Sequence, residues 1–74
     1  MNESQKQLFL EIQEKSLELN SLIKVNEDAF PQDMFETIKL HEQSCLFFQN
    51  IGEHYRVLYE INNARKLVDE FLGI

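Results

Sequence analysis

Two residues of types that bind metals or act in nucleophilic catalysis, His41 and Cys45, stand four positions apart in a segment with helical periodicity. This spacing places both side chains on one face of a helix, with Glu42 beside them. The pair is half of a zinc site, because zinc needs three or four protein ligands. The only other histidine, His54, falls about 140° away around the same helix. We therefore expect no metal site and no cofactor, and we interpret His41 and Cys45 as residues that pack against the N-terminal helix.

Cysteine catalysis would require a reactive Cys45 thiolate with His41 as its base. Cys45 instead begins the apolar run Cys45-Leu46-Phe47-Phe48, where burial would raise the thiol pKa and shield it from a substrate. Paired carboxylates for acid-base chemistry would need a concave pocket, and a thin helical domain offers little concavity. The chain also has no glycine-rich phosphate loop, because it contains only two glycines. We predict that the protein is not an enzyme and has no catalytic residues.

The aromatic residues are more informative, because six Phe and two Tyr are many rings for a chain of 74 residues. Tyr55 and Tyr59 stand one helical turn apart with Arg56 between them, and Tyr and Arg are enriched at protein interfaces. A thin helical domain has too little interior to bury every ring, although an ordinary core with the tyrosine hydroxyls at its rim is the alternative. We predict that a partner-binding face is formed by Phe47, Ile51, Tyr55, Leu58, Tyr59 and Ile61.

The charge balance restricts the kinds of partner. The chain has 13 Asp and Glu against 7 Lys and Arg, which gives a net charge of −6. Nucleic acid and anionic membranes are bound by surfaces rich in Lys and Arg, so we expect neither direct nucleic-acid binding nor membrane binding. No apolar run approaches the roughly 20 residues that span a bilayer. An alternative function that the charge suggests is an acidic decoy or antirepressor, which blocks the nucleic-acid-binding surface of a basic protein.

The length and the single cysteine indicate the setting in which the protein works. One cysteine cannot form an internal disulfide, and residues 1–7 are polar without the pattern of a signal peptide, so we expect a cytoplasmic protein. A chain of this size forms at most one domain and buries only about 60% of its unfolded surface. A lone monomer is therefore marginally stable, and we expect a homodimer or a small heterocomplex.

The first element that would position these residues is an N-terminal helix. Ser4 and Gln7 have the spacing of a capping box and predict a helix over residues 4–25. Its apolar stripe spans roughly 100° of the helix surface and consists of Leu8, Ile12, Leu19, Leu22 and Ile23. Leu10 and Leu17 lie on nearly the opposite side, where they either form a second, thinner contact or remain two exposed leucines.

A turn over residues 26–30 is predicted next, because Asn26 favours a cap and Pro31 disfavours helical backbone at Phe30. Residues 31–72 then form a helical segment with two possible architectures. An unbroken helix of about 40 residues would pair with the first helix as an antiparallel hairpin. A break near Gly52 or Asn62 would instead give a small three-helix bundle.

The phase of the apolar positions favours an unbroken helix at Gly52. One stripe of positions is spaced alternately four and three residues apart, and this spacing continues through the glycine. The stripe consists of Met34, Ile38, His41, Cys45, Phe48, Gly52, Tyr55 and Tyr59. A second stripe on a neighbouring face consists of Phe47, Ile51, Leu58, Ile61, Val68 and Leu72. In the unbroken helix, residues 54–72 would extend past the first helix and would need a second chain to cover them.

The sequence as a whole predicts an all-α protein with a single helical domain over residues 1–74. Its expected function is that of a small acidic interaction module, such as an adaptor, co-chaperone or regulator. Such a module acts by docking an apolar and aromatic helix face against a partner protein.

Overall fold

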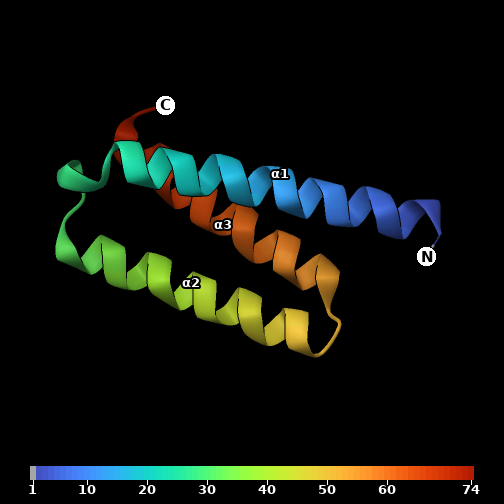
Figure 1. Cartoon of the computed structure of the whole chain (residues 1–74). Helices are drawn as coiled ribbons and strands as arrows, with labels where there is room; N and C mark the ends of the chain where they lie inside the picture. The colour runs from blue at the N-terminus through green and yellow to red at the C-terminus, as the bar shows by residue number, and fades with distance from the viewer. Residues whose placement is uncertain (1) are drawn as a thin grey trace.

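The chain folds into three α-helices and one short 3-10 helix, and the computed structural model describes residues 2–74. The elements are α1 (Glu3–Val25), η1 (Glu27–Ala29), α2 (Gln32–Asn50) and α3 (His54–Leu72). The chain reverses direction at η1 and again between α2 and α3 (Figure 1). The described residues form no strand, so the all-α prediction is confirmed, and of the two predicted architectures the three-helix bundle is the one observed.

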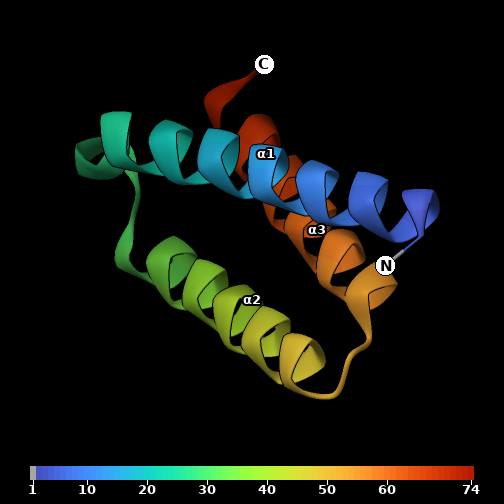
Figure 2. The ribbon, with the colours of Figure 1, turned by 45° about the vertical axis from the view of Figure 1, so that its right-hand side comes forward.

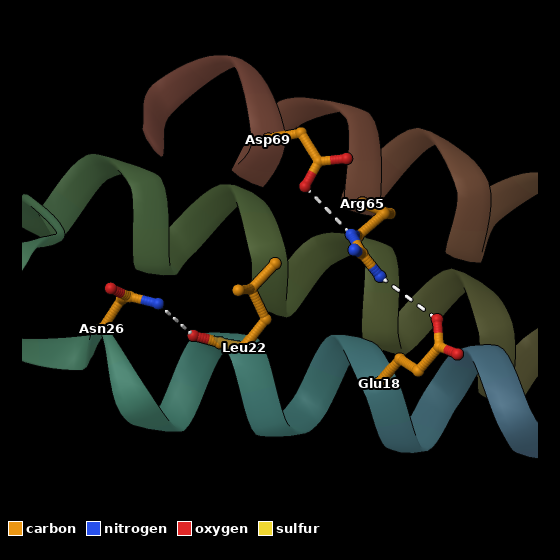
Figure 3. Close-up of polar contacts among 5 residues, drawn as sticks. All are labelled: Glu18, Leu22, Asn26, Arg65 and Asp69. Atoms are coloured by element: carbon orange, nitrogen blue, oxygen red, sulfur yellow. Dashed lines mark hydrogen bonds and ion pairs between the residues drawn. The ribbon is translucent and has the colours of Figure 1, made fainter. Parts of the chain in front are cut away.

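The ends of α1 are fixed by two asparagines. A capping box begins α1, but it is formed by Asn2 and Gln5, so the predicted Ser4–Gln7 box is wrong. The Asn2 side chain accepts a hydrogen bond from the Gln5 N–H at 2.8 Å. Asparagine caps a helix as well as serine does, so the helix begins at Asn2, which precedes Ser4 in the chain. At the other end, the Asn26 side-chain amide donates to the Leu22 carbonyl oxygen at 2.9 Å (Figure 3), which ends α1 where the sequence predicts.

The break between α2 and α3 lies at Gly52, which is one of the two predicted breakpoints, although the phase of the apolar positions favours an unbroken helix there. Gly52 has φ +76°, a left-handed conformation that glycine adopts at little cost. The Glu53 N–H donates to the Phe48 carbonyl at 2.8 Å, and the Gly52 N–H donates to the Gln49 carbonyl at 3.1 Å. These two bonds are the Schellman motif that commonly ends helices. Asn62, the other predicted breakpoint, lies inside α3.

The central helix is α3, which packs against both α1 and α2. It contributes four buried side chains to the core, those of Val57, Ile61, Ala64 and Val68. The helices α1 and α2 meet at η1 and splay apart from there, with α3 behind the opening between them (Figure 2). The inward stripe of α3, which includes Ile61 and Val68, is covered by α1 and α2 and needs no second chain, whereas Tyr55 and Tyr59 on its reverse side remain exposed.

The other core residues come from α1, α2 and the connection between them. The buried ones are Leu8, Ile12, Leu19, Phe30, Met34 and Ile38, and Leu22 and Ile23 pack against them. The predicted stripe of α1 is therefore confirmed. Leu10 and Leu17 are both exposed, and no helix of the described chain covers them.

Polar and aromatic contacts hold α3 against its neighbours. Arg65 of α3 forms an ion pair with Glu18 of α1 at 3.4 Å and another with Asp69, one turn along α3, at 2.9 Å (Figure 3). The Phe30 ring lies edge-on to the Phe71 ring with 5.3 Å between their centroids. This contact connects the end of α3 to the segment between α1 and α2.

Candidate protein-binding surfaces

Four of the six predicted partner-binding residues lie on the surface around the α2–α3 turn. The exposed fractions are 59% for Phe47, 56% for Ile51, 73% for Tyr55 and 65% for Tyr59. We call these four residues the outer face. Leu58 is half-buried against the core, and Ile61 is only 6% exposed. Ile61 is therefore a core residue of α3 and is not available to a partner.

One residue of the outer face, Phe47, packs against a neighbouring ring. The Phe47 ring lies edge-on to the Phe48 ring, with 5.5 Å between centroids. The Arg56 guanidinium of α3 stacks over the same Phe48 ring at 5.5 Å, a cation–π contact. The Arg56–Phe48 contact links the last turn of α2 to the first turn of α3, beside the exposed Phe47 ring.

The two tyrosines lie on the reverse side of α3 from the core. Val57, Ile61 and Ala64 face the interior, and Tyr55 and Tyr59 are rotated from them by roughly 170° around the helix. Their exposure follows from this rotation. The sequence pattern had placed both tyrosines on one stripe with Met34 and Ile38, but the turn at Gly52 changes the phase between the two helices.

A hollow that sequence reasoning missed is lined by residues of α1, α2 and α3. Its volume is about 280 Å³. The apolar residues that line it come from all three helices and include Leu19, Ile23, Ile38, Leu46, Val57 and Ala64. No periodicity within one helix signals this hollow, because it arises from the angle at which α1 and α2 diverge.

His41 and Cys45 both line the hollow, but they do not interact as a catalytic pair. His41 Nδ1 donates to Glu60 Oε2 at 2.7 Å, and the Cys45 thiol donates to the Val57 carbonyl with Sγ at 3.8 Å from the oxygen. Burial raises the pKa of the Cys45 thiol, as predicted, and the carboxylates of Glu60 and Glu42 raise this pKa further. The thiol is therefore held in its protonated form, which is a poor nucleophile and a poor metal ligand.

Within residues 2–74, no group of three or more His, Cys, Asp and Glu side chains is placed to hold a metal ion. His54 lies at the start of α3, where its ring packs edge-on against Phe9 of α1, with 4.6 Å between the ring centroids.

None of the described helices has the length and the apolar character needed to cross a membrane. No protein-family model, curated protein or solved structure matches the chain.

Proposed function

We propose that the protein is a small acidic interaction module that binds a partner protein through the outer face. The observation that carries this proposal is the exposure of four large side chains, each more than half accessible, between residues 47 and 59. Single exposed apolar residues are common on soluble proteins, and a group of large apolar and aromatic ones is typical of an interaction site. A module of this kind acts as an adaptor, co-chaperone or regulator by binding, without catalysis.

The chemistry of the outer face supports this proposal. Tyrosine is enriched among the residues that carry most of the binding energy at interfaces, because its large ring has few rotatable bonds. Phe47 also has few rotatable bonds, so ordering its ring on binding costs little side-chain entropy. Arg56 provides a positive charge next to the rings, which suits a partner with a hydrogen-bond acceptor at the rim.

The net charge favours a different protein over a second copy as the partner. Each copy carries −6, so two copies repel each other, whereas a partner with Lys and Arg around an apolar patch is attracted. One argument for the homodimer predicted from the sequence is also weaker, since Ile61 and Val68 of α3 are buried within one chain. We therefore propose a heterocomplex with a protein that presents an apolar surface flanked by basic residues.

The test uses two neighbouring residues of α2 with nearly equal exposure, Phe47 at 59% and Leu46 at 61%. A photo-crosslinking residue at Tyr55 identifies the partner in cells, and the affinity of the purified pair is then measured by calorimetry. Phe47→Ser should weaken binding by about tenfold or more, which corresponds to the loss of a central aromatic contact. Leu46→Ser, which changes the hollow and leaves the outer face intact, is the matched control and should bind normally.

Three outcomes would contradict the proposal. Equal affinity of the Phe47→Ser and unchanged chains would show that the outer face is not the site. A dimer in sedimentation that Phe47→Ser dissociates would assign this face to a second copy. Affinity that falls steeply with salt and ignores Phe47→Ser would favour the acidic-decoy alternative, because screening weakens charge interactions much more than apolar docking.

A further inference from the structure

Three large apolar side chains form one exposed stripe along α2. Leu40 is 64% exposed, and Phe47 and Ile51 are also more than half exposed. At about 100° per residue these three positions lie within roughly 40° of one another around the helix. The buried Met34 and Ile38 lie roughly 120° and 160° away from Leu40, so the three exposed side chains point away from the core. We call these three residues the α2 stripe, which extends the outer face along α2 to Leu40.

The spacing around the α2 stripe is that of one side of a helix pair. In coiled-coil packing, four residues at positions i, i+3, i+4 and i+7 of one helix surround a single side chain of the other. Such a set of four is formed by Leu40, Gln43, Ser44 and Phe47. Ser44 is the smallest of them, so the set has room for a large side chain from a second helix. The same spacing recurs one turn later, at Ser44, Phe47, Phe48 and Ile51.

The charges differ between the two ends of the α2 stripe. Asp33 and Glu36 are exposed in the first turns of α2, and both lie within roughly 40° of Leu40 around the helix. Lys39 lies off the stripe, roughly 100° from Leu40, and residues 43–52 contain no charged side chain. Lys and Arg are favoured in the last turn of a helix by the helix dipole. The end of a second helix that suits Asp33 and Glu36 is therefore its C-terminal end.

We propose that the α2 stripe binds one amphipathic helix of the partner protein, which runs antiparallel to α2 and carries Lys or Arg in its last turn. This inference rests on the proposed function, because Phe47 and Ile51 belong to the outer face, and it specifies what the partner presents there. The α2 helix of a second copy lacks this character, since its last turn has no basic residue. From Asp33 to Ile51 the surface is about 27 Å long at 1.5 Å per residue, which corresponds to a helix of about 18 residues.

The experiment uses a synthetic peptide of about 18 residues as the probe. It is built from Leu, Ala, Gln and Lys, with the leucines alternately three and four positions apart and the lysines in the last turn. One control peptide carries the lysines in its first turn, and another has the same composition in scrambled order. Binding is followed by NMR titration of the isotopically labelled full chain, which reports both the affinity and the backbone amides whose signals shift.

Two leucines of α2 provide the matched variants. Leu40 and Leu46 are 64% and 61% exposed, but Leu46 lies roughly 120° away from Leu40 around the helix. Leu40→Ser should weaken binding of the probe by about tenfold, because a large apolar contact is lost, and Phe47→Ser should do the same. Leu46→Ser should bind the probe as the unchanged chain does.

The expected signals are specific to the α2 stripe. The probe should shift the amide signals of Leu40, Ser44 and Phe47 and should leave those of α1 unchanged. It should bind about threefold more tightly than the peptide with lysines in its first turn. A chain with both Asp33→Asn and Glu36→Gln should lose this preference, because the substitutions remove the two charges and retain the shapes of the side chains.

The proposal is overturned if the probe shifts no amide of α2, if the scrambled peptide binds equally well, or if Leu46→Ser weakens binding as much as Leu40→Ser does. Equal binding of the two lysine arrangements would overturn the antiparallel orientation. Signals of the α2 stripe that shift with the concentration of the chain alone would assign it to a second copy instead.

The partner isolated through Tyr55 separates this inference from the proposed function. A partner whose affinity falls with Phe47→Ser but not with Leu40→Ser would support the outer face and overturn docking of a helix along α2. A probe that responds to Leu40→Ser, together with a partner that ignores Phe47→Ser, would support a helix site on α2 and refute the proposed function.

Discussion

The helices α2 and α3 have the same length, 19 residues, but they differ in how many of their side chains are buried. Four side chains of α3 are buried, from Val57 to Val68, whereas α2 buries only Met34 and Ile38. No residue of α2 after Ile38 is buried. The reason is position: α3 lies against two helices and α2 against one. The second half of α2 is therefore free to carry a binding surface, with Leu46 at the hollow and Phe47 on the outer face.

The largest expected effect comes from a charge in the middle of α3. Val68 is 0% exposed, so Val68→Asp would bury a carboxylate without a partner and should cost more than about 4 kcal/mol, enough to unfold a domain of this size. Leu40→Asp, at an exposed position of α2, should keep the native helical content in circular dichroism. A folded Val68→Asp chain would refute the central role of α3.

A smaller change in stability is expected from substitutions at two isoleucines that lie ten positions apart. Ile61→Ala should lower the free energy of unfolding by about 2–5 kcal/mol, because Ile61 is buried in the core. Ile51→Ala should change it by less than about 0.5 kcal/mol, because Ile51 is exposed beside the turn. Urea titrations with a stabilising osmolyte keep the folded baseline measurable. Equal losses for the two variants would mean that Ile51 is covered in solution.

The two glycines test the boundary between α2 and α3. Both have φ +76°, and a Cβ at either position would have no atom within 4 Å, so the backbone conformation alone sets the cost. Gly52→Ala and Gly73→Ala should each destabilise the fold by about 1 kcal/mol, because alanine adopts the left-handed conformation at a cost. The Tm values of both variants report this loss. A Gly52→Ala chain that gained helical content and dimerised would have adopted the unbroken helix that the apolar phase favours.

The smallest expected effect concerns Cys45 and pH. Its pKa is raised in the folded chain, so the neutral thiol is the form that the fold favours. The resulting stability is fully present below the pKa of the unfolded thiol and is lost as the pH rises through the higher, folded value. Stability should therefore decline more at alkaline pH for the unchanged chain than for Cys45→Ser in matched urea titrations. If the free energy of unfolding declined equally with pH in the unchanged chain and in Cys45→Ser, the thiol would not be desolvated in the fold.

The sequence predicted the N-terminal half of the fold well, because its signals are local. The apolar stripe that contains Leu8, Ile12 and Leu19 needs only helical periodicity to be recognised, and Asn26 and Pro31 delimit the turn by their own backbone preferences. The helix over residues 4–25 was accordingly predicted to within one residue of α1.

The second half was predicted less well because two signals conflicted at Gly52. The alternation of apolar residues passes through this position unchanged and favours an unbroken helix, whereas glycine tends to end helices. As a result Val57 and Ala64 were missed as core residues, and Ile61 was assigned to the surface. Exposure of the outer face was predicted correctly for Phe47 and the two tyrosines, because a thin core cannot bury every aromatic ring of the chain. The hollow was not predictable, since it depends on an interhelical angle.

The central position of α3 has a consequence for synthesis of the protein. The ribosome makes α1 and α2 first, but neither has a shared surface to pack on until residues 54–72 have emerged. During this interval Leu8, Ile12, Met34 and Ile38 are in contact with water or with a chaperone. The nascent chain therefore acquires its native packing late and nearly all at once, when its last helix becomes available.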